Sequence, residues 1–393
     1  MDFEFATTPQ IVFRPGALHQ LGEYAAGFGR RAWLITGGDN IERAGIVGRA
    51  MERLVASGVD AVRLPVATEP DTRLCDAGAR AARGAGCNLV IAVGGGSALD
   101  TGKAIAFLAA NGGECLDYLE VVGRGKKPER PSLPFIAVPT TAGTGSEVTR
   151  NAVIADPASG MKASIRNDYL FPRLALLDPL LTHSLPPEIT AATGLDALIQ
   201  LIEPYVSRRH HPMIDALALE GIRRAAPALP RAYAAGDDAP AREAMMLAAM
   251  WSGMALAHCG LGASHAFAGP LGGSYPIPHG FACAVTLPHV MEANLAAAQR
   301  TADGARTVSR YAEVARALGA PEGRSAADTA RAGVEIARKL CSSMWVPSLS
   351  KFGVTRDAIP DLVANARRTS SMKANPVDLS DEELAGILEK AIG

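Results

Sequence analysis

The segment NLVIAVGGGSALDTGKAIA, residues 88–106, decides the fold of the first half of the chain. Its uninterrupted apolar run is typical of a strand buried on both faces of a parallel sheet. Gly94–Gly96 then allow a sharp turn before a helix that begins near Ala98. Because helix N-termini favour anions, strand, glycines and helix in this order predict a phosphate-binding turn. The alternative is an ordinary tight turn with a capping box formed by Ser97 and Asp100.

Short apolar runs alternate with helical patterns on both sides of this segment. We expect strands at about 31–36, 61–66 and 134–138, and helices at about 41–57 and 72–84. Strands separated by helices of this length imply βαβ units and a parallel sheet. The first half is therefore predicted to be an α/β domain.

The second half has a different composition. It is rich in alanine, leucine and methionine, as in residues 241–257, and predicts a domain made almost entirely of helices. Pro186-Pro187 suits a linker or a helix start but not a helix interior. We therefore place an α/β domain at residues 1–184 and a helical domain at residues 185–393.

The overall composition narrows the function. The 39 lysines and arginines are balanced by 40 acids, so no cationic surplus attracts nucleic acid or an anionic membrane. The six cysteines form no Cys-x-x-Cys pair, which favours reduced, buried thiols. We find no signal peptide and no apolar run near the roughly 20 residues of a membrane span. We expect a cytoplasmic enzyme with a small-molecule substrate, and expect His210-His211, which follow two arginines, to be solvated.

A second loop of glycines and hydroxyl residues, PTTAGTGSEV at 139–148, follows the predicted strand that ends at Val138. Open α/β sheets bind their ligands at the carboxyl ends of strands. The loop therefore predicts a second contact with the same ligand, although an ordinary Ser/Thr loop has a similar composition.

Three potential metal ligands lie in the second half. Asp196 lies in a helical pattern, and His265 and His279 lie in the Gly- and Pro-rich stretch 262–280. One carboxylate and two imidazoles suit Zn²⁺ or Fe²⁺. Gln200, four residues after Asp196, would point the same way on a helix. Each residue alone is more simply a capping acid or a core histidine, but their joint placement favours a metal site.

Five segments form a set that extends over most of the chain: GGGSALDTGK at 94–103, PTTAGTGSEVT at 139–149, LLDP at 176–179, GLDA at 194–197, and PHG at 278–280 followed by LPH at 287–289. With these motifs the whole chain resembles the iron-containing (group III) alcohol dehydrogenase family. The resemblance implies an α/β dinucleotide-binding domain, an all-helical domain and a site in the cleft between them. It implies hydride transfer between NAD or NADP and a small alcohol, aldehyde or ketone, assisted by Fe²⁺ or Zn²⁺, and a homodimer.

The resemblance also implies which residues contact the cofactor. Together with Gly94 from the glycine turn, they are Gly95, Gly96, Ser97, Asp100, Thr140, Thr141, Thr144 and Lys162.

Two departures concern the catalytic centre. The family's metal set of one aspartate and three histidines becomes Asp196, Gln200, His265 and His279 here. An amide oxygen is a weaker donor than imidazole, so any metal is expected to be weakly held. Gly269 stands where the family usually has a histidine near the nicotinamide, so a proton-relay role cannot be transferred to this position.

A third departure concerns the choice of cofactor. Gly37 and Gly38 occupy the strand end that often carries an aspartate bound to the adenosine ribose. Without that carboxylate a 2′-phosphate is not repelled, so NADP becomes admissible.

Other activities stay open at this point. A metal-independent reductase of an oxo-acid, similar to maleylacetate reductases, would use His265, His279 or Tyr275 as hydrogen-bond donors to the carbonyl. A cyclising lyase of the dehydroquinate synthase type is less favoured, because the motifs carry no surplus of lysine or arginine for a substrate phosphate. A non-catalytic protein would leave both cofactor loops unexplained.

Overall fold

The computed structural model describes residues 2–393, which form two compact units. The α/β unit is Ala6–Leu185, and the helical unit is Pro186–Gly393 together with the N-terminal residues up to Phe5. The N-terminal segment lies with the helical unit because Phe3 stacks on His211 and Phe5 stacks on His258, with ring centroids 4.3 and 4.6 Å apart. The sequence had placed this segment in the α/β domain.

The α/β unit is built on a six-stranded, all-parallel sheet with the order β1-β8-β5-β4-β2-β3. This sheet confirms the predicted fold class. The strands are β1 Ile11–Phe13, β2 Arg31–Thr36, β3 Asp60–Pro65, β4 Leu89–Gly94, β5 Phe135–Pro139 and β8 Leu174–Leu177. A separate antiparallel hairpin pairs β6 Asn151–Asp156 with β7 Met161–Arg166.

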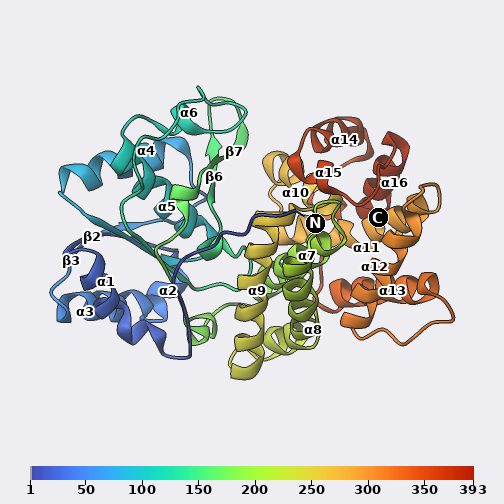
Figure 1. The fold of residues 1–393 in the computed structure, drawn as a ribbon, viewed down its shortest axis with the longest axis horizontal. Helices are drawn as coiled ribbons and strands as arrows, with labels where there is room; N and C mark the ends of the chain where they lie inside the picture. Colours follow the sequence, from blue (N-terminus) through green and yellow to red (C-terminus); the bar gives the residue numbers. More distant parts are fainter. Residues whose placement is uncertain (1) are drawn as a thin grey trace. The chain divides into compact units, whose positions relative to one another are not determined.

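Helices cover both faces of the sheet (Figure 1). Successive strand residues point to opposite faces, so Leu34 and Ile91 pack in the core beneath the first helix pair, whereas Ile35 and Val90 pack beneath the second pair. The first pair is α1 Leu21–Phe28 and α3 Ile46–Ala56, and the second is α4 Thr72–Gly84 and α5 Gly96–Asn111; the short helix α6 spans Cys115–Tyr118.

The helix expected over about 41–57 is interrupted. The chain forms the short helix α2 Asp39–Arg43 and then α3, which begins at Ile46. Gly45 between them has a φ of 68°, a left-handed conformation that ends the helical hydrogen-bond pattern and that glycine adopts without strain.

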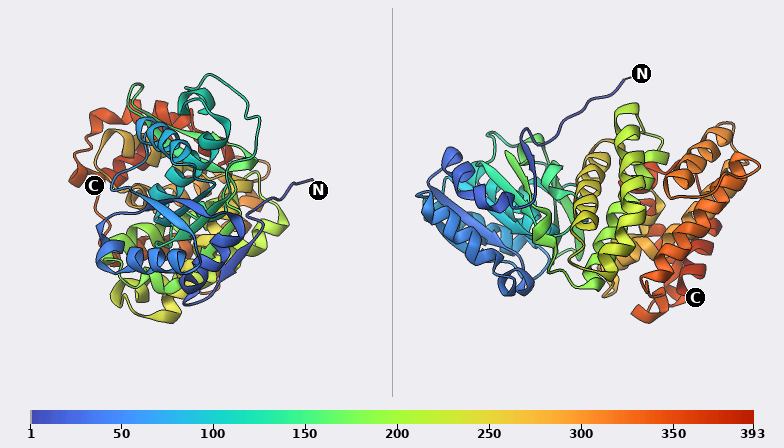
Figure 2. Two further views of the ribbon diagram at one scale, coloured as in Figure 1. Left: turned by 90° about the vertical axis from the view of Figure 1, so that its left-hand side faces the viewer. Right: turned by 90° about the horizontal axis from the view of Figure 1, so that it is seen from below.

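The helical unit consists of α7 Pro187–Val206, α8 Pro212–Ala234, α9 Ala239–Cys259, α10 Ala263–Ser274, α11 His279–Ala298, α12 Gly304–Ala317, α13 Ala326–Ser343, α14 Ile359–Arg367, α15 Ser370–Ala374 and α16 Asp381–Ile392. Helix α7 starts at Pro187, as the Pro186-Pro187 pair allows, and packs against α8, α9 and α11 (Figures 1 and 2). Nearly all of its side chains are buried. The buried charged residues of α7, Asp196 and Glu203, must therefore find their partners inside the protein.

The expectations for the cysteines and for His210-His211 have different outcomes. All six cysteines are free and buried, as the sequence indicates. His210-His211 is not a solvated pair, because His211 is buried against Phe3 and His210 Nδ1 lies 3.0 Å from Asp215 Oδ2. Within residues 2–393 no single helix has the length and apolar composition to cross a membrane; α9 and α10 meet that test only as a pair, and they are bent by 99°.

A buried charged cluster joins α5 to the hairpin. Lys103 Nζ donates to Thr149 Oγ1 (2.8 Å) and to the Asn151 carbonyl (2.9 Å), and lies 3.9 Å from Asp100 Oδ1. Burial lowers the pKa of Lys103 to about 8, although Asp100 and Glu147 oppose the shift. Burial likewise raises the pKa of Glu147 to about 7.

The raised pKa of Glu147 makes stability depend on pH. A carboxyl whose pKa is higher in the folded state stabilises the protein below its unfolded value of 4.5, and this contribution is lost as pH rises to about 7. We expect the stability of the parent relative to Glu147→Gln to fall by up to about 3 kcal/mol between about pH 5 and pH 7.5. Denaturant unfolding at both pH values measures the difference. The exposed Glu129→Gln variant is the control, and an equal dependence in both variants would contradict the assignment.

Candidate functional site

Three loops follow neighbouring parallel strands of the α/β unit. Strand β4 lies between β2 and β5, with Thr36 paired to Val93 and Gly94 paired to Pro139. The carboxyl ends of these strands therefore lie at one edge of the sheet. The predicted cofactor residues at positions 37–38, 94–97 and 140–144 follow directly from them, which is where open α/β sheets bind ligands.

The glycines of the turn are required by close packing. A Cβ on Gly94 would lie 2.6 Å from Ala98 Cβ, and a Cβ on Gly96 would lie 2.7 Å from Thr144 Cγ2. At Gly95 the nearest atom, Thr141 Cγ2, would be 3.2 Å away. The absence of side chains thus lets the start of α5 approach the second loop. Gly95 is the N-cap and forms no side-chain cap, so the capping box considered from the sequence is not formed.

Two of the predicted cofactor residues form contacts within the protein. Asp100 Oδ1 accepts a hydrogen bond from Ser146 Oγ (2.6 Å), and Oδ2 accepts one from the Val153 amide (2.9 Å). These bonds fix the second loop and the hairpin to α5. Lys162 on β7 forms an ion pair with Glu69.

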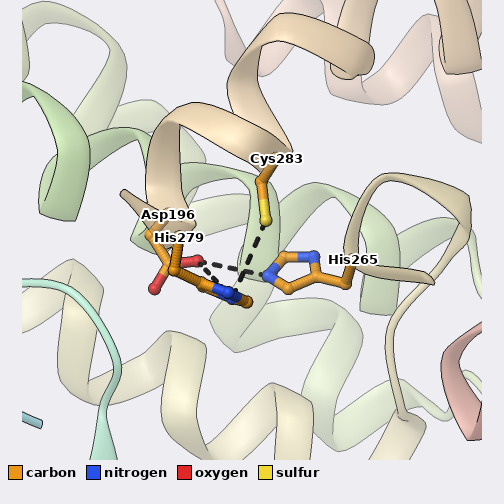
Figure 3. Close-up of side chains that lie close together, drawn as sticks. All are labelled: Asp196, His265, His279 and Cys283. Atoms are coloured by element: carbon orange, nitrogen blue, oxygen red, sulfur yellow. Dashed lines mark hydrogen bonds and ion pairs between the residues drawn. The ribbon is translucent and has the colours of Figure 1, made fainter. Parts of the chain in front are cut away.

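The predicted metal residues of the helical unit come together, with one addition. Asp196 from α7, His265 from α10, and His279 and Cys283 from α11 place one ligand atom each within 4.8 Å of one another (Figure 3). Asp196 Oδ1 lies 3.2 Å from His265 Nε2 and 3.8 Å from His279 Nε2. Cys283 Sγ lies 3.8 Å from His279 Nε2. The His279 side chain is 51% exposed while the other three side chains are buried, so the group is accessible from the side of His279.

Glu203, two turns after Asp196 on α7, holds His265 in place. Its Oε2 accepts hydrogen bonds from His265 Nδ1 (2.6 Å) and the Gly262 amide (2.8 Å), and its Oε1 accepts one from the Ser264 amide (2.8 Å). With Nδ1 donating to a carboxylate, the other ring nitrogen of His265, Nε2, faces Asp196 at 3.2 Å and becomes a metal ligand when its proton is released. Metal-binding histidines commonly have a carboxylate partner of this kind.

Gln200 interacts with Asp196. Its Nε2 donates to Asp196 Oδ2 at 2.8 Å, which leaves Oδ1 of the carboxylate toward the two imidazoles. Its Oε1 is buried and accepts no hydrogen bond from the described residues. Gln200 therefore orients the carboxylate.

The neighbouring charges in this group shift one another's pKa values in the direction that favours the ionised forms. Burial alone would raise the pKa of Asp196, but the hydrogen bond from His265 and the nearby imidazoles bring it below its ordinary value. Burial would also lower the pKa of His265, yet Cys283 and Glu203 raise it well above its ordinary value. Burial would raise the pKa of the Cys283 thiol, and the charges of both imidazoles lower it. The group therefore favours a thiolate and a carboxylate beside the imidazoles.

Sequence reasoning missed Cys283 and Glu203. Cys283 follows His279 by four residues, and Glu203 follows Asp196 by seven, so the helical spacing that pointed to Gln200 also marks both positions. Tyr275, a candidate catalytic residue, is the C-cap of α10 and is not among the four clustered side chains. Gly269 on α10 has open space around its Cβ position.

Comparison with known proteins identifies the family. The family model described as iron-containing alcohol dehydrogenase matches residues 8–179, and the model described as Fe-containing alcohol dehydrogenase family, C-terminal, matches residues 190–392. The chain belongs to the iron-containing alcohol dehydrogenase family, as its motifs indicate. The donor set fits a divalent metal such as Zn²⁺ or Fe²⁺, because one ligand atom each from a carboxylate, two imidazoles and a thiol lie within 4.8 Å of one another.

Relatives match over nearly the whole chain. Alcohol dehydrogenase 4 of Saccharomyces cerevisiae (strain YJM789) is 36% identical over 98% of both chains, and the NAD-dependent methanol dehydrogenase of Bacillus methanolicus is 32% identical over 99% of both. A crystal structure of 1,3-propanediol oxidoreductase superposes with a TM-score of 0.92 at 31% identity, covering 100% of both chains.

The contact between Glu203 and His265 predicts how metal affinity depends on Glu203. Glu203→Gln keeps the size of the side chain but removes the charge that fixes the His265 tautomer, so we expect Zn²⁺ affinity to fall about 10–100-fold. Competition with a chromophoric chelator measures the affinity. Glu220→Gln on the exposed surface of α8 is the control, and equal affinities in the two variants would show that Glu203 does not orient a ligand.

Proposed function

We propose that this protein is an NAD(P)-dependent alcohol dehydrogenase that interconverts a small alcohol and its aldehyde or ketone with metal assistance. The observation that carries the proposal is the convergence of Asp196, His265 and His279, held by Glu203, in a chain of this family. The glycine turn and the threonine loop supply the nucleotide-binding half. The names of the relatives favour short alcohols and diols as substrates.

The helical unit binds the substrate and orients its reacting oxygen. When bound, a divalent metal acts as a Lewis acid toward the substrate oxygen, and the nicotinamide donates or accepts the hydride. Asp196 and His265 are rigid because Gln200 and Glu203 occupy their remaining hydrogen-bonding atoms. The half-exposed His279 lies on the side from which a small oxygen-containing substrate reaches the group.

The α/β unit binds the nucleotide. Asp100 fixes the second loop through Ser146, and the short Gly94–Gly96 turn allows the pyrophosphate to approach the N-terminus of α5. In this mechanism Asp100 positions the loop that contacts the cofactor.

The end of β2 favours NADP as well as NAD. Gly38 has open space around its Cβ position, and a glycine at position 38 offers no carboxylate of its own to the ribose. Arg63 on the neighbouring strand β3 donates from Nε to Thr36 Oγ1 (3.0 Å) and pairs through Nη2 with Glu42, which holds its guanidinium at the same strand end. A guanidinium at this place can accept a 2′-phosphate. We infer that NADPH is used at least as well as NADH.

Hydride transfer is tested by following NADH and NADPH oxidation with a panel of small aldehydes and ketones. We expect turnover by the parent, its loss on chelation and its recovery with Zn²⁺ or Fe²⁺. Gly95→Asp should bind neither cofactor, because it places a negative charge in the turn and its Cβ 3.2 Å from Thr141. Turnover that survives chelation would assign the protein to a metal-independent reductase, and undiminished binding by Gly95→Asp would exclude the turn as the phosphate site.

Cofactor preference is tested with Gly38→Asp and Arg63→Ala. Position 38 is preferable to position 37, because a Cβ on Gly37 would lie 3.2 Å from the backbone of Gly94. We expect Gly38→Asp to shift the ratio of kcat/KM values toward NADH, and Arg63→Ala to lower kcat/KM for NADPH about tenfold, the worth of one charged hydrogen bond. The exposed Arg49→Ala variant is the control. A parent that strongly prefers NADH would exclude this arrangement.

A further inference from the structure

Cys283 is placed as a fourth donor to the metal group. It lies one helical turn after His279 on α11, so both side chains point to the same side of the helix (Figure 3). Its Sγ is 3.8 Å from His279 Nε2 and within 4.8 Å of the Asp196 and His265 donors. The side chain is fully buried. The other five cysteines are not part of this group.

The distances suit one common metal ion. Bonds of about 2.0–2.2 Å to nitrogen and oxygen and about 2.3 Å to sulfur place tetrahedral ligand atoms about 3.3–3.6 Å apart. Asp196 Oδ1 lies 3.2 Å from His265 Nε2 and 3.8 Å from His279 Nε2. Cys283 Sγ lies 3.8 Å from His279 Nε2. These three separations are within a few tenths of an ångström of that range, and the other three are at most 4.8 Å, so side-chain movements of about 1 Å would bring all four atoms to one centre.

Gln200 is already engaged on the opposite side of Asp196. Its amide group donates to Oδ2, while the two imidazoles lie near Oδ1. A neutral amide oxygen is also a poorer ligand than a thiolate for zinc. Gln200, which replaces the expected histidine, thus orients the ligand Asp196. A fourth donor atom is available instead from Cys283 on α11.

We propose that Cys283 binds the metal as a thiolate and serves as the fourth protein ligand in the place of the histidine missing at position 200. This inference rests on the metal-assisted function proposed above. On binding, the Cys283 thiol loses its proton to solvent and forms a bond between sulfur and the metal. A donor set of carboxylate, two imidazoles and thiolate favours Zn²⁺ over Fe²⁺, because soft sulfur ligands and the order of metal affinities both act in that direction.

Cobalt provides a direct probe of the ligand. The chelated full-length protein is titrated with Co²⁺ under anaerobic conditions and its absorption spectrum recorded. We expect visible ligand-field bands together with a near-ultraviolet band from charge transfer between thiolate and Co²⁺. Cys283→Ser should keep the ligand-field bands and lose the charge-transfer band, whereas the control Cys87→Ser, in the α/β unit, should keep both.

A rescue experiment tests the exchange of roles. We expect Cys283→Ala to lower Zn²⁺ affinity at least about tenfold, since loss of a mere supporting contact already costs that much. Adding Gln200→His to Cys283→Ala restores the family's donor set and should recover the affinity. Circular dichroism establishes that the variants are folded. The cobalt spectrum of the parent tests the ligand without any substitution, so that test does not depend on the folding of a variant.

Three results would overturn the inference. Ligand-field bands without a thiolate band in the parent would show that metal binds without Cys283, and the metal-assisted function would still stand. If Gln200→Leu, rather than Cys283→Ala, abolished Zn²⁺ binding, the amide oxygen would be the fourth ligand. Failure of the parent to bind Co²⁺ would also overturn it, and would remove the metal from the proposed function while NAD(P)H oxidation still tests hydride transfer.

Discussion

The burial of two carboxylates on one face of α7 governs the site. Asp196 and Glu203 lie on a helix whose side chains are almost all buried, and an unpaired charge there would cost several kcal/mol. Glu203 is satisfied by the first backbone amides of α10 and by His265, which fixes that helix and its imidazole together. Asp196 is satisfied by Gln200 on one oxygen and by imidazole on the other. The hydrogen bonds that compensate the two buried carboxylates also orient Asp196 and His265 as metal ligands.

The main features of the fold were predictable because they are set by local pattern. Strands β2, β4 and β5 contain continuous apolar runs, β3 is marked by its place between two helical patterns, and the boundaries of all four differ little from those expected. Strands β1 and β8 have three and four residues, too few for a periodic signal, and are defined by pairing with each other and, for β8, with β5. The break at Gly45 depends on one backbone angle, which a hydrophobic pattern does not report.

Only those site residues were predictable whose side-chain type and motif together indicate metal binding. Asp196, His265 and His279 stood out by motif, and the structure brings them together. Cys283 resembled the other buried thiols, and its role follows from the turn of α11 that also carries His279. Helical spacing places Glu203 on the same face of α7 as Asp196, but its pairing with His265, 62 residues further along the sequence, depends on where the start of α10 meets α7.

The stacking of Phe3 and Phe5 on the helical unit means that this unit is not a contiguous piece of the chain. The partners His211 and His258 follow the whole α/β unit in the sequence and are synthesised after it. The N-terminal segment must therefore wait through most of translation before it can pack. A fragment that starts at Pro186 would also lack both aromatic rings, leaving the imidazole surface of α8 and α9 uncovered, so the boundary of the helical unit along the sequence is not its boundary in space.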